Sequence, residues 1–555
     1  MEQCAPEPKS YWLGFVFCAV LSIKFAVYDA WISLPDFYLA GFIYNCLSST
    51  IALYVIFSIF RWNVFIVSVC YIFGLVLFAV TFEYFSYCHR PFHIAVLLFQ
   101  FREASSAAVN HELIFRSEGL LFLIDVPVFL ILIKNLNSNQ KRRKWCGSSA
   151  LIPLCGILIL VAGTVGAWCL GKGLLSPSIT DKQVVSIHGW TGYWGVGLVK
   201  HLFPMPIPSP GPECRAQTYE NKISKPNFIM LQVESLDSNV VNWSYNGKKI
   251  MPFLSEFSKK NAYFPRMISQ HLGGGSSDAE WASLTSMPAD RVYALLQHAR
   301  IDSTEVLPGI LKSQGYSVNA YHGNSGGFYR RKQSYVRMGF DTFFDHDDLR
   351  LPTVGWGAPD ADLFNAFLRR YSSEGEPRFD YIITLTSHEP FRWVEKIDID
   401  LPDFKGAGSP ESIRYLRSMT YVDRCLREFI SRVDLRNTYV FMYGDHTPWV
   451  PMDRASTIKE NEFHDCSVEN LGVLIECVPL IIAGPNVLSS RRDVIVSMTD
   501  IMPTVIGLTN ASVRYKSQGI DLLNDSKGEV DITICGKTMT RKYVGAIVRS
   551  LYPFN

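Results

Sequence analysis

Five long apolar runs follow one another in the N-terminal part of this 555-residue chain, and they constrain its fold more than any other feature. The runs cover residues 11–34, 37–60, 64–85, 119–133 and 151–170. A helix that crosses a bilayer needs about 20 predominantly apolar residues, and most of the runs come close to that length, although the fourth is shorter. One such run would also suit a buried helix of a soluble protein, but five in series predict five membrane-spanning helices.

The basic residues around these runs indicate their orientation. The segment NQKRRK, residues 139–144, lies between the fourth and fifth runs, and Lys9 and Arg61 fall on the same side when five helices alternate. Lys and Arg accumulate on the cytoplasmic side, so the sequence after residue 171 is expected outside the cytoplasmic (inner) membrane. The first run lacks a small-residue cleavage site and is followed directly by another, which favours a retained anchor over a removed signal peptide. A multi-pass protein is therefore predicted.

Composition changes along the chain and predicts three parts. Residues 1–171 are expected to form the transmembrane domain, residues 172–225, with clusters of Gly, Pro and Ser, an extracytoplasmic linker, and residues 226–555 an exported domain. The formal net charge is only +2, which argues against nucleic acid as a partner. In the exported part, Cys466 and Cys477 form the most plausible local disulfide pair.

Short apolar strands and helical patterns alternate after residue 226. Strands are expected in NFIMLQVES, YSVNAYHGN, FDYIITLTSHEPF, TYVFMYGDHTP and VPLIIAGPNV, and helices in MPFLSEFSKK and SIRYLRSMTYVDRCLREFISRV. Strands separated by helices favour an α/β domain with a mainly parallel central sheet. In such a sheet ligands bind beyond the carboxyl ends of the strands, so the polar residues that close each strand are candidates for a functional site.

Acid and imidazole side chains close four of the predicted strands. They are Glu234, His322, His388, and Asp445 with His446. One polar residue after a strand is unremarkable, because a strand must end somewhere, but five such groups at four strand ends form a set. Carboxylates and imidazoles together are typical ligands of a divalent ion such as Mn, Zn or Mg. The sequence therefore predicts one divalent metal site at this edge of the sheet.

The stretch HLGGGSSDAEWASL, residues 271–284, has three glycines and two serines where a helix is expected to begin. Ser277 and Glu280 fit the S-x-x-E capping box, in which the serine caps the helix and the glutamate reaches back. Ser276 would then be left available at the positive end of the helix, where an alkoxide or a bound phosphate is favoured. The glycines would allow a close approach of the backbone to a phosphate.

With these motifs in their order, the chain resembles the lipoteichoic acid synthase group of phosphoglycerol transferases, within the alkaline phosphatase and sulfatase superfamily. The segments that carry the resemblance are MLQVES, GGSSDAEW, HGNSGGFYRRKQSY, MGFDTFFD, SHEPF and YGDHTP. Members of that group have five N-terminal spans, a linker and an external sulfatase-like domain, and the resemblance covers nearly the whole chain. GDH alone would be weak evidence, whereas the ordered set is specific.

The resemblance assigns a role to each candidate residue. It makes Glu234, Asp445 and His446 ligands of a divalent ion, commonly manganese in this group, with Ser276 as a further ligand and the nucleophile. It also places His322, Arg331, Tyr329 and His388 around the substrate phosphate. A serine hydroxyl needs a metal or a base to become a good nucleophile, an arginine can grip phosphate oxygens in a bidentate way, and His388 could exchange a proton with the leaving and accepting alcohols.

Three positions depart from the family pattern. The usual nucleophile is threonine, where this chain has Ser276; the aromatic position is commonly tryptophan, where it has Tyr329; and Asn324 stands where aspartate is common. The last two could change selectivity for the head group. The expected function is that of a membrane-anchored, metal-dependent phosphotransferase. It would move a phosphoglycerol group from phosphatidylglycerol to an extracytoplasmic glycan or polyglycerolphosphate acceptor through a covalent phospho-Ser276 intermediate.

Other functions remain open on the sequence alone. A phosphoethanolamine transferase on the same fold ranks second, because such enzymes tend to have more exported disulfides and a different nucleophile motif. A sulfatase that oxidises its catalytic residue needs a C/S-x-P-x-R context, whereas Ser276 is followed by SDAEW. A non-catalytic membrane protein is also possible in principle, although degeneration should have removed the metal ligands. The sequence does not identify the acceptor, or distinguish polymerisation from a single transfer.

Overall fold

The computed structural model divides the chain into two compact units, one within Met1–Met205 and one that holds most of the chain from Pro206 onward. The structure describes residues 8–32, 63–88, 125–139, 210–216, 223–271, 275–289, 294–298, 303–372, 375–448, 466–468, 473–509, 511–524, 531–534 and 537–551, with isolated positions at 43–57, 123 and 193. The predicted domain boundaries at residues 171 and 225 stay predictions, because residues 140–192, 194–209 and 217–222 lie outside these ranges.

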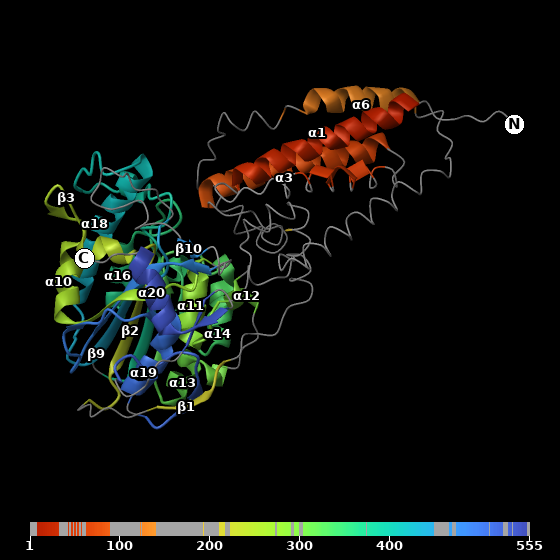
Figure 1. Ribbon diagram of the computed structural model, residues 1–555. Coiled ribbons are helices and arrows are strands. Elements are labelled where there is room, and N and C mark those ends of the chain that lie inside the picture. The colour runs from red at the N-terminus through yellow and green to blue at the C-terminus, as the bar shows by residue number, and fades with distance from the viewer. Residues whose placement is uncertain are drawn as a thin grey trace. The chain divides into compact units, whose positions relative to one another are not determined.

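The described part of the first unit consists mainly of three apolar helices (Figure 1). They are α1 (Pro8–Ile32), α3 (Val64–Cys88) and α6 (Val126–Asn139). Phe17 from α1, Tyr71 from α3 and Leu132 from α6 pack in one buried cluster. The Lys24 ammonium lies 2.8 Å from a carboxylate oxygen of Asp125, and both side chains are buried, so an ion pair joins α1 to the start of α6.

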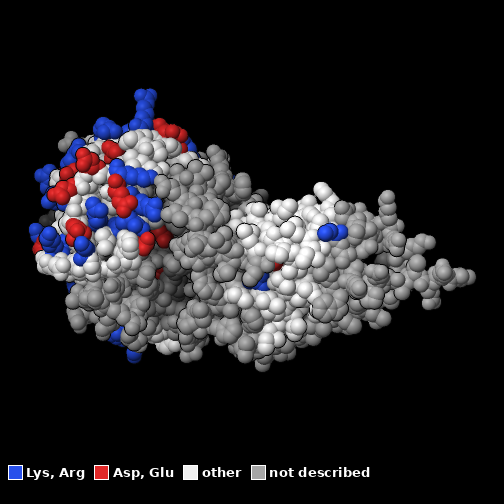
Figure 2. All heavy atoms as spheres, turned by 90° about the horizontal axis from the view of Figure 1, so that it is seen from above, with Lys and Arg blue, Asp and Glu red and all other residues white. Residues whose placement is uncertain are grey.

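One helix of the described residues, Val64–Phe82 within α3, is long and apolar enough to cross a membrane, and the apolar part of α1, Phe15–Tyr28, is shorter. Figure 2 shows few charged side chains on the described surface of this unit, whereas charges of both signs cover the visible face of the other. The predicted run 37–60 lies largely, and the run 151–170 wholly, outside the described residues. A count of five spans therefore stays a prediction.

A nine-stranded sheet forms the centre of the second unit, in the order β13-β5-β12-β9-β2-β8-β6-β7, with β14 also paired to β5. The strands are β2 (Asn227–Val233), β5 (Ala262–Ile268), β6 (Ser317–His322), β7 (Thr342–Phe344), β8 (Arg378–Ile383), β9 (Thr438–Gly444), β12 (Cys477–Ala483), β13 (Ser490–Arg491) and β14 (Val496–Ser497). Only β12 runs antiparallel to its neighbours, β5 and β9. The predicted α/β domain with a mainly parallel sheet is confirmed.

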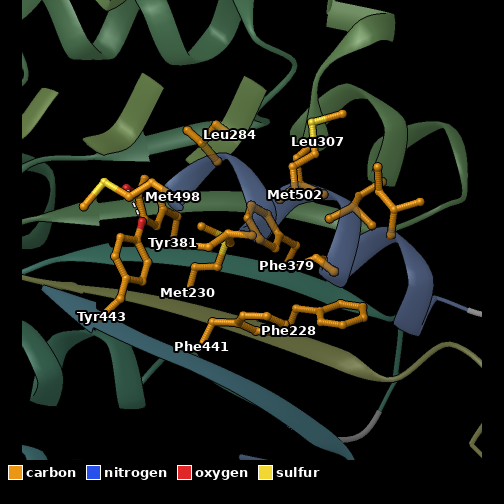
Figure 3. Packing of buried hydrophobic residues seen from close by; sticks show 14 of the residues in the cluster. Phe228, Met230, Leu284, Leu307, Phe379, Tyr381, Phe441, Tyr443, Met498 and Met502 are labelled. Atoms are coloured by element: carbon orange, nitrogen blue, oxygen red, sulfur yellow. Dashed lines mark hydrogen bonds between the residues drawn. The ribbon is translucent and has the colours of Figure 1, made fainter. Parts of the chain in front are cut away.

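Helices cover both faces of this sheet, because the strands are apolar on both sides. Successive side chains of β2 alternate between two cores: Ile229 and Leu231 pack on one face, and Phe228 and Met230 on the other. The first face carries α10 (Pro252–Lys260), α16 (Asp360–Leu368) and α18 (Pro410–Ser431). The second carries α11 (Ser276–Thr285), α13 (Leu307–Ser313), α14 (Arg331–Arg337) and α19 (Ile501–Leu508), and Figure 3 shows its core from close by.

Shorter elements connect these layers. The remaining helices are α9 (Ser238–Asn242), α12 (Leu295–His298), α15 (His346–Leu349), α17 (Trp393–Lys396) and α20 (Arg541–Leu551), with the 3₁₀ turns η4 (Ser303–Glu305), η5 (Phe328–Arg330) and η7 (Met498–Asp500). Four two-stranded sheets pair β1 (Glu213–Arg215) with β15 (Arg514–Lys516), β3 (Ser244–Tyr245) with β4 (Lys248–Lys249), β10 (Cys466–Val468) with β11 (Val473–Ile475), and β16 (Ile532–Ile534) with β17 (Lys537–Met539).

The predicted disulfide between Cys466 and Cys477 is wrong. Cys466 lies opposite Ile475 in the pair of strands β10 and β11, and Cys477 is a buried cysteine at the start of β12 that forms no disulfide. The two cysteines are close in sequence, but Cys477 belongs to the central sheet, whereas Cys466 pairs outside it. Cys477 acts there as a small apolar residue of the core.

Candidate metal centre and active site

Two adjacent parallel strands end side by side and bring two carboxylates together. Residue Val233 of β2 pairs with Gly444 of β9, so the next residues, Glu234 and Asp445, leave the sheet at the same edge. The backbone turns sharply here, because Ser235 has a positive φ of 53°. Parallel strands that end in register thus explain how residues more than 200 positions apart meet at one point.

Glu234, Asp445 and His446 form a buried group whose ligand atoms all lie within 4.8 Å of one another. The Nε2 atom of His446 is 3.3 Å from Oε1 of Glu234 and 3.7 Å from Oδ2 of Asp445. Its Nδ1 contacts the carbonyl oxygen of Thr447 at 3.0 Å, so an Nδ1 proton would leave the Nε2 lone pair directed at the carboxylates.

Charges within this group shift one another's pKa. Burial raises the pKa of Asp445, and the neighbouring charge of Glu234 adds to that. Burial also disfavours ionisation of Glu234, but the charge of His388 and the hydrogen bond from His446 outweigh it and lower the pKa of Glu234. Burial opposes a charged His446, yet the charges of Asp445 and Glu234 raise its pKa. Two buried carboxylates at this distance require positive charge nearby.

The group fits a divalent metal ion. Oδ1 of Asp445 accepts the N–H groups of Ser235 and His446, each at 2.8 Å, whereas its buried Oδ2 has no hydrogen-bond partner among the described residues. A carboxylate oxygen in that position is costly without a cation to coordinate. Two carboxylates and one imidazole are ligands that suit Mn, Zn or Mg, so the residues could hold a metal whose identity they do not fix.

Ser276 lies beside this group at the start of α11. Its Oγ donates a hydrogen bond of 3.0 Å to Oε2 of Glu234. Gly275, at the helix N-cap, has φ 56° and ψ −135°, a conformation that a residue with a Cβ rarely adopts. Glycine therefore lets the chain turn so that the first helical residue presents its hydroxyl to the metal centre, close to the positive end of the helix.

The predicted capping box at Ser277 and Glu280 is wrong. The N-cap of α11 is Gly275, and no side chain caps the helix. The carboxylate of Glu280 is instead fully buried and binds Arg331, with Nη2 of Arg331 2.6 Å and Nε 3.0 Å from Oε1. The hydroxyl of Tyr335 donates to Oε2 of Glu280 at 2.6 Å. A long-range partner thus outcompetes the local backbone for this carboxylate.

His322, Arg331 and Tyr329 lie together next to α11. Nη1 of Arg331 is 3.5 Å from Nε2 of His322, and the guanidinium carbon is 5.2 Å from the centre of the Tyr329 ring. Tyr329 has a positive φ of 52°. A Cβ placed on Gly275 would lie 3.5 Å from the Tyr329 hydroxyl, so this aromatic side chain reaches the start of α11. The structure therefore brings these three residues together beside α11, the helix that begins with Ser276.

His388 borders the group on the side of β8. The charge of His388 is the leading influence that lowers the pKa of Glu234. Its Nδ1 contacts the carbonyl oxygen of Glu389 at 2.7 Å, and its ring stacks on Trp356 at 4.9 Å between ring centres. The next carboxyl, Glu389, has its pKa raised to about 8 by burial. His388 is thus held by a backbone carbonyl on one side and an aromatic face on the other.

Two residues that contact the site, Trp356 and His271, were not identified from the sequence. Trp356 stacks on His388 and contacts the ring of Phe328, and the only signal for it is a tryptophan between two glycines. His271 is the second. Its ring stacks on His446 at 4.3 Å, and its Nδ1 lies 3.1 Å from the buried carboxylate of Glu476. No local pattern could have revealed that contact.

Comparison with known proteins places the chain in a family. A model of the family described as Sulfatase matches residues 226–511, which is more than half of the chain. This chain belongs to the sulfatase family. It is a member of the sulfatase and alkaline phosphatase superfamily that is related to lipoteichoic acid synthases. The predicted family is therefore confirmed.

Two curated relatives and one solved structure illustrate the relation of this sulfatase-family chain to others. Lipoteichoic acid synthase 2 of Bacillus subtilis is 27% identical over 340 residues, or 59% of this chain and 51% of that protein. Lipoteichoic acid synthase of Staphylococcus aureus (strain USA300) is 28% identical over 359 residues, or 60% and 52%. The chain thus spans about half the length of these curated relatives.

The structure of the integral membrane protein lipooligosaccharide phosphoethanolamine transferase A from Neisseria meningitidis is similar to this chain with a TM-score of 0.57 at 15% identity. The similarity covers 91% of this chain and 96% of that one. An identity this low shows the fold alone. In this sulfatase-family fold, a hydroxyl, a metal-binding group, a guanidinium and two imidazoles converge at one edge of the sheet, which is the set needed to bind and transfer a charged tetrahedral group.

Proposed function

We propose that this protein is a membrane-anchored phosphoglycerol transferase with Ser276 as its nucleophile. Phosphatidylglycerol donates the phosphoglycerol group, and an extracytoplasmic glycan or polyglycerolphosphate chain accepts it. The observation that carries the proposal is the hydrogen bond of 3.0 Å that places Oγ of Ser276 on Glu234, within the buried group that could hold a metal. The relation to lipoteichoic acid synthases supports the choice of donor.

The reaction proceeds by two displacements at phosphorus. Oγ of Ser276 releases its proton to solvent and forms a bond to phosphorus, the bond from phosphorus to the diacylglycerol oxygen breaks, and diacylglycerol leaves with a proton from His388. An acceptor hydroxyl then gives its proton to His388 and attacks the same phosphorus, and the bond to Ser276 breaks as Oγ takes up a proton from solvent. A divalent ion held by Glu234, Asp445 and His446 would supply Lewis acidity to the serine and to a phosphoryl oxygen. Arg331 binds the phosphate oxygens.

Membrane anchoring suits a lipid donor. The predicted five spans would keep the catalytic unit on the extracytoplasmic side of the inner membrane, where ATP is absent and an already esterified phosphate is the practical source of the group. The apolar helix at Val64–Phe82 is the part of this arrangement that the described residues contain.

The test is mass spectrometry of the full-length protein after incubation with phosphatidylglycerol or phosphatidylethanolamine and Mn²⁺. A phosphoglycerol adduct on Ser276 is expected, and it should be absent from Ser276→Ala. Ser277→Ala is the matched control, because that neighbouring serine is also buried near the helix start and should leave the adduct intact. A phosphoethanolamine adduct would replace the proposed donor by the rival one, and the absence of adduct and turnover with both lipids would refute the transferase.

The second candidate is a phosphoethanolamine transferase on the same fold. The solved structure that covers 91% of this chain comes from such an enzyme, although 15% identity carries only the fold. A hydrolytic sulfatase is the least supported candidate function, since Ser276 is followed by Ser277 and Asp278 rather than by the proline and arginine that serine oxidation requires. The two lipid arms of the experiment separate these possibilities directly.

A further inference from the structure

The N–H groups of Arg331 fall into two sets: some donate hydrogen bonds to protein groups, and the others have no acceptor among the described residues. Glu280 takes one edge of the guanidinium: Nε lies 3.0 Å from Oε1 and 3.1 Å from Oε2, and Nη2 lies 2.6 Å from Oε1. Tyr335 holds the other side of that carboxylate through a bond of 2.6 Å to Oε2. All three side chains are buried. The edge formed by Nε and Nη2 is therefore committed to the protein.

His322 occupies a further N–H of the same guanidinium. Its Nδ1 is 3.0 Å from the carbonyl oxygen of Ile383, an acceptor, so the Nδ1 atom carries the proton and Nε2 has the free lone pair. That Nε2 faces Nη1 of Arg331 at 3.5 Å and accepts from it. Burial, with the charge of Arg331 beside it, lowers the pKa of His322 to about 3, which keeps the ring neutral and an acceptor.

One N–H on Nη1 and one on Nη2 remain. No acceptor among the described residues takes them. Because Glu280 binds the edge formed by Nε and Nη2, the remaining N–H of Nη2 lies at the end of the guanidinium, and the protein leaves donors uncovered that suit the oxygens of a tetrahedral oxyanion.

We propose that Glu280 and His322 are positioning residues that hold Arg331 so that the end of its guanidinium faces the substrate phosphate. His322 then acts through Arg331 rather than by binding phosphate itself, which differs from the role that the family resemblance assigns to it. The inference rests on the proposed function in one respect, that a phosphate group is the ligand of Arg331.

Helix α11 gives this arrangement a further consequence. Ser276 and Glu280 are four residues apart on α11, so slightly more than one helical turn, or roughly 6 Å along the axis, separates the nucleophile from the anchor of the phosphate-binding side chain. One rigid element thus sets the position of the attacking oxygen and that of the phosphate.

The test is a double-mutant cycle in the full-length protein, with turnover of fluorescent phosphatidylglycerol in the presence of Mn²⁺. Arg331→Ala and Glu280→Ala are each expected to lower kcat/KM by about 100-fold, as misplacement of a reacting group does. The double variant should be no more than about 3-fold worse than Arg331→Ala, because Glu280 has nothing left to position. Losses that multiply in the double variant would overturn the proposal. The same cycle with His322→Ala tests the second positioning residue.

If Glu280→Ala folds poorly, Glu280→Gln tests the positioning role in its place. An amide oxygen in the place of Oε1 can still accept from both Nε and Nη2, so this variant should recover at least about one tenth of wild-type turnover. Turnover as low as that of Glu280→Ala would contradict a positioning role. The matched control is the buried ion pair of Asp500 and Arg541, away from the site, with distances of 2.7 and 2.8 Å. Asp500→Asn should lower the melting temperature without changing kcat.

A binding measurement separates this inference from the proposed function. Calorimetric titration of the Mn²⁺-loaded protein with sn-glycerol 3-phosphate should show the same non-additivity between Arg331→Ala and Glu280→Ala. If wild-type protein binds this probe with that pattern but turns over neither lipid, the proposed function fails and the positioning role stands. If wild-type protein turns over phosphatidylglycerol and the losses in binding multiply, the positioning role alone falls.

Discussion

Asp445→Asn tests the metal centre while it preserves the backbone around it. Oδ1 of Asp445 accepts the N–H groups of Ser235 and His446, and an asparagine carbonyl oxygen can accept both. The amide nitrogen replaces Oδ2, the buried oxygen that has no hydrogen-bond partner among the described residues and that we propose as a metal ligand. The substitution therefore removes one ligand and one negative charge, and leaves the local hydrogen bonds in place.

The expected result has opposite signs with and without metal. Mn²⁺ at 100 times its Kd should stabilise wild-type protein by about 2.7 kcal/mol, and a loss of affinity of about 100-fold reduces this to about 0.4 kcal/mol. Without metal, the variant should be the more stable protein at pH 8. Folding raises the pKa of Asp445, through burial and the charge of Glu234, so the metal-free wild type loses stability as the pH rises above the unfolded value of about 3.9. Asparagine does not titrate.

Thermal unfolding of the full-length protein in EDTA and in Mn²⁺, at pH 8 and pH 5, measures both effects. Asp360→Asn is the matched control: Oδ1 of Asp360 accepts the N–H groups of Leu385 and Thr386, its buried Oδ2 has no partner among the described residues, and burial raises its pKa to about 6. This control should keep the full response to Mn²⁺. Retention of that response by Asp445→Asn would refute the assignment of Asp445 as a ligand.

Two further substitutions test other parts of the site, and a third tests a buried ion pair outside it. His271→Phe keeps a ring against His446 but loses the hydrogen bond to the carboxylate of Glu476, and should weaken Mn²⁺ binding in calorimetry by about 10-fold with little change in melting temperature. Gly275→Ala forces a residue with a Cβ to adopt a positive φ. It should lower the free energy of unfolding, measured with denaturant, by about 1 kcal/mol or more and reduce formation of the proposed phosphoglycerol adduct on Ser276. Asp500→Asn leaves the buried Arg541 without its charge partner and should cost about 3 to 5 kcal/mol, with unchanged Mn²⁺ affinity.

The positions of Glu234 and Asp445 could be predicted from the sequence because the end of an apolar strand can be recognised locally, and the ends of neighbouring parallel strands lie together in the fold. Each residue follows an apolar strand, and parallel strands that are neighbours end at one edge. The mainly parallel sheet itself follows from the alternation of strands and helices. The single exception, β12, reverses direction after a stretch whose pattern contains no sign of a hairpin, so its antiparallel pairing could not be predicted.

Partners that lie far apart in the sequence could not be predicted in this way. His271 and Glu476 are 205 residues apart and meet only because β5 and β12 are paired. Trp356 lies in a loop with no periodic pattern, yet it forms the surface on which the His388 ring stacks. A sequence without an alignment carries no signal for such contacts, since each residue alone is compatible with many environments.

The prediction of a capping box at Glu280 was wrong for a specific physical reason. A capping box needs a helix start whose glutamate can lie in solvent beside its own backbone, whereas nearly every residue of α11, including Trp281 and Leu284, is buried. A helix that is buried on all sides has no solvated face for a carboxylate. A buried carboxylate requires a cation, and several basic residues follow in the sequence, among them Arg331. The apolar residues on both sides of Glu280 thus already favoured an ion pair over a cap, and the ion pair with Arg331 lies four residues from Ser276, where the proposed reaction needs a positive charge for the phosphate.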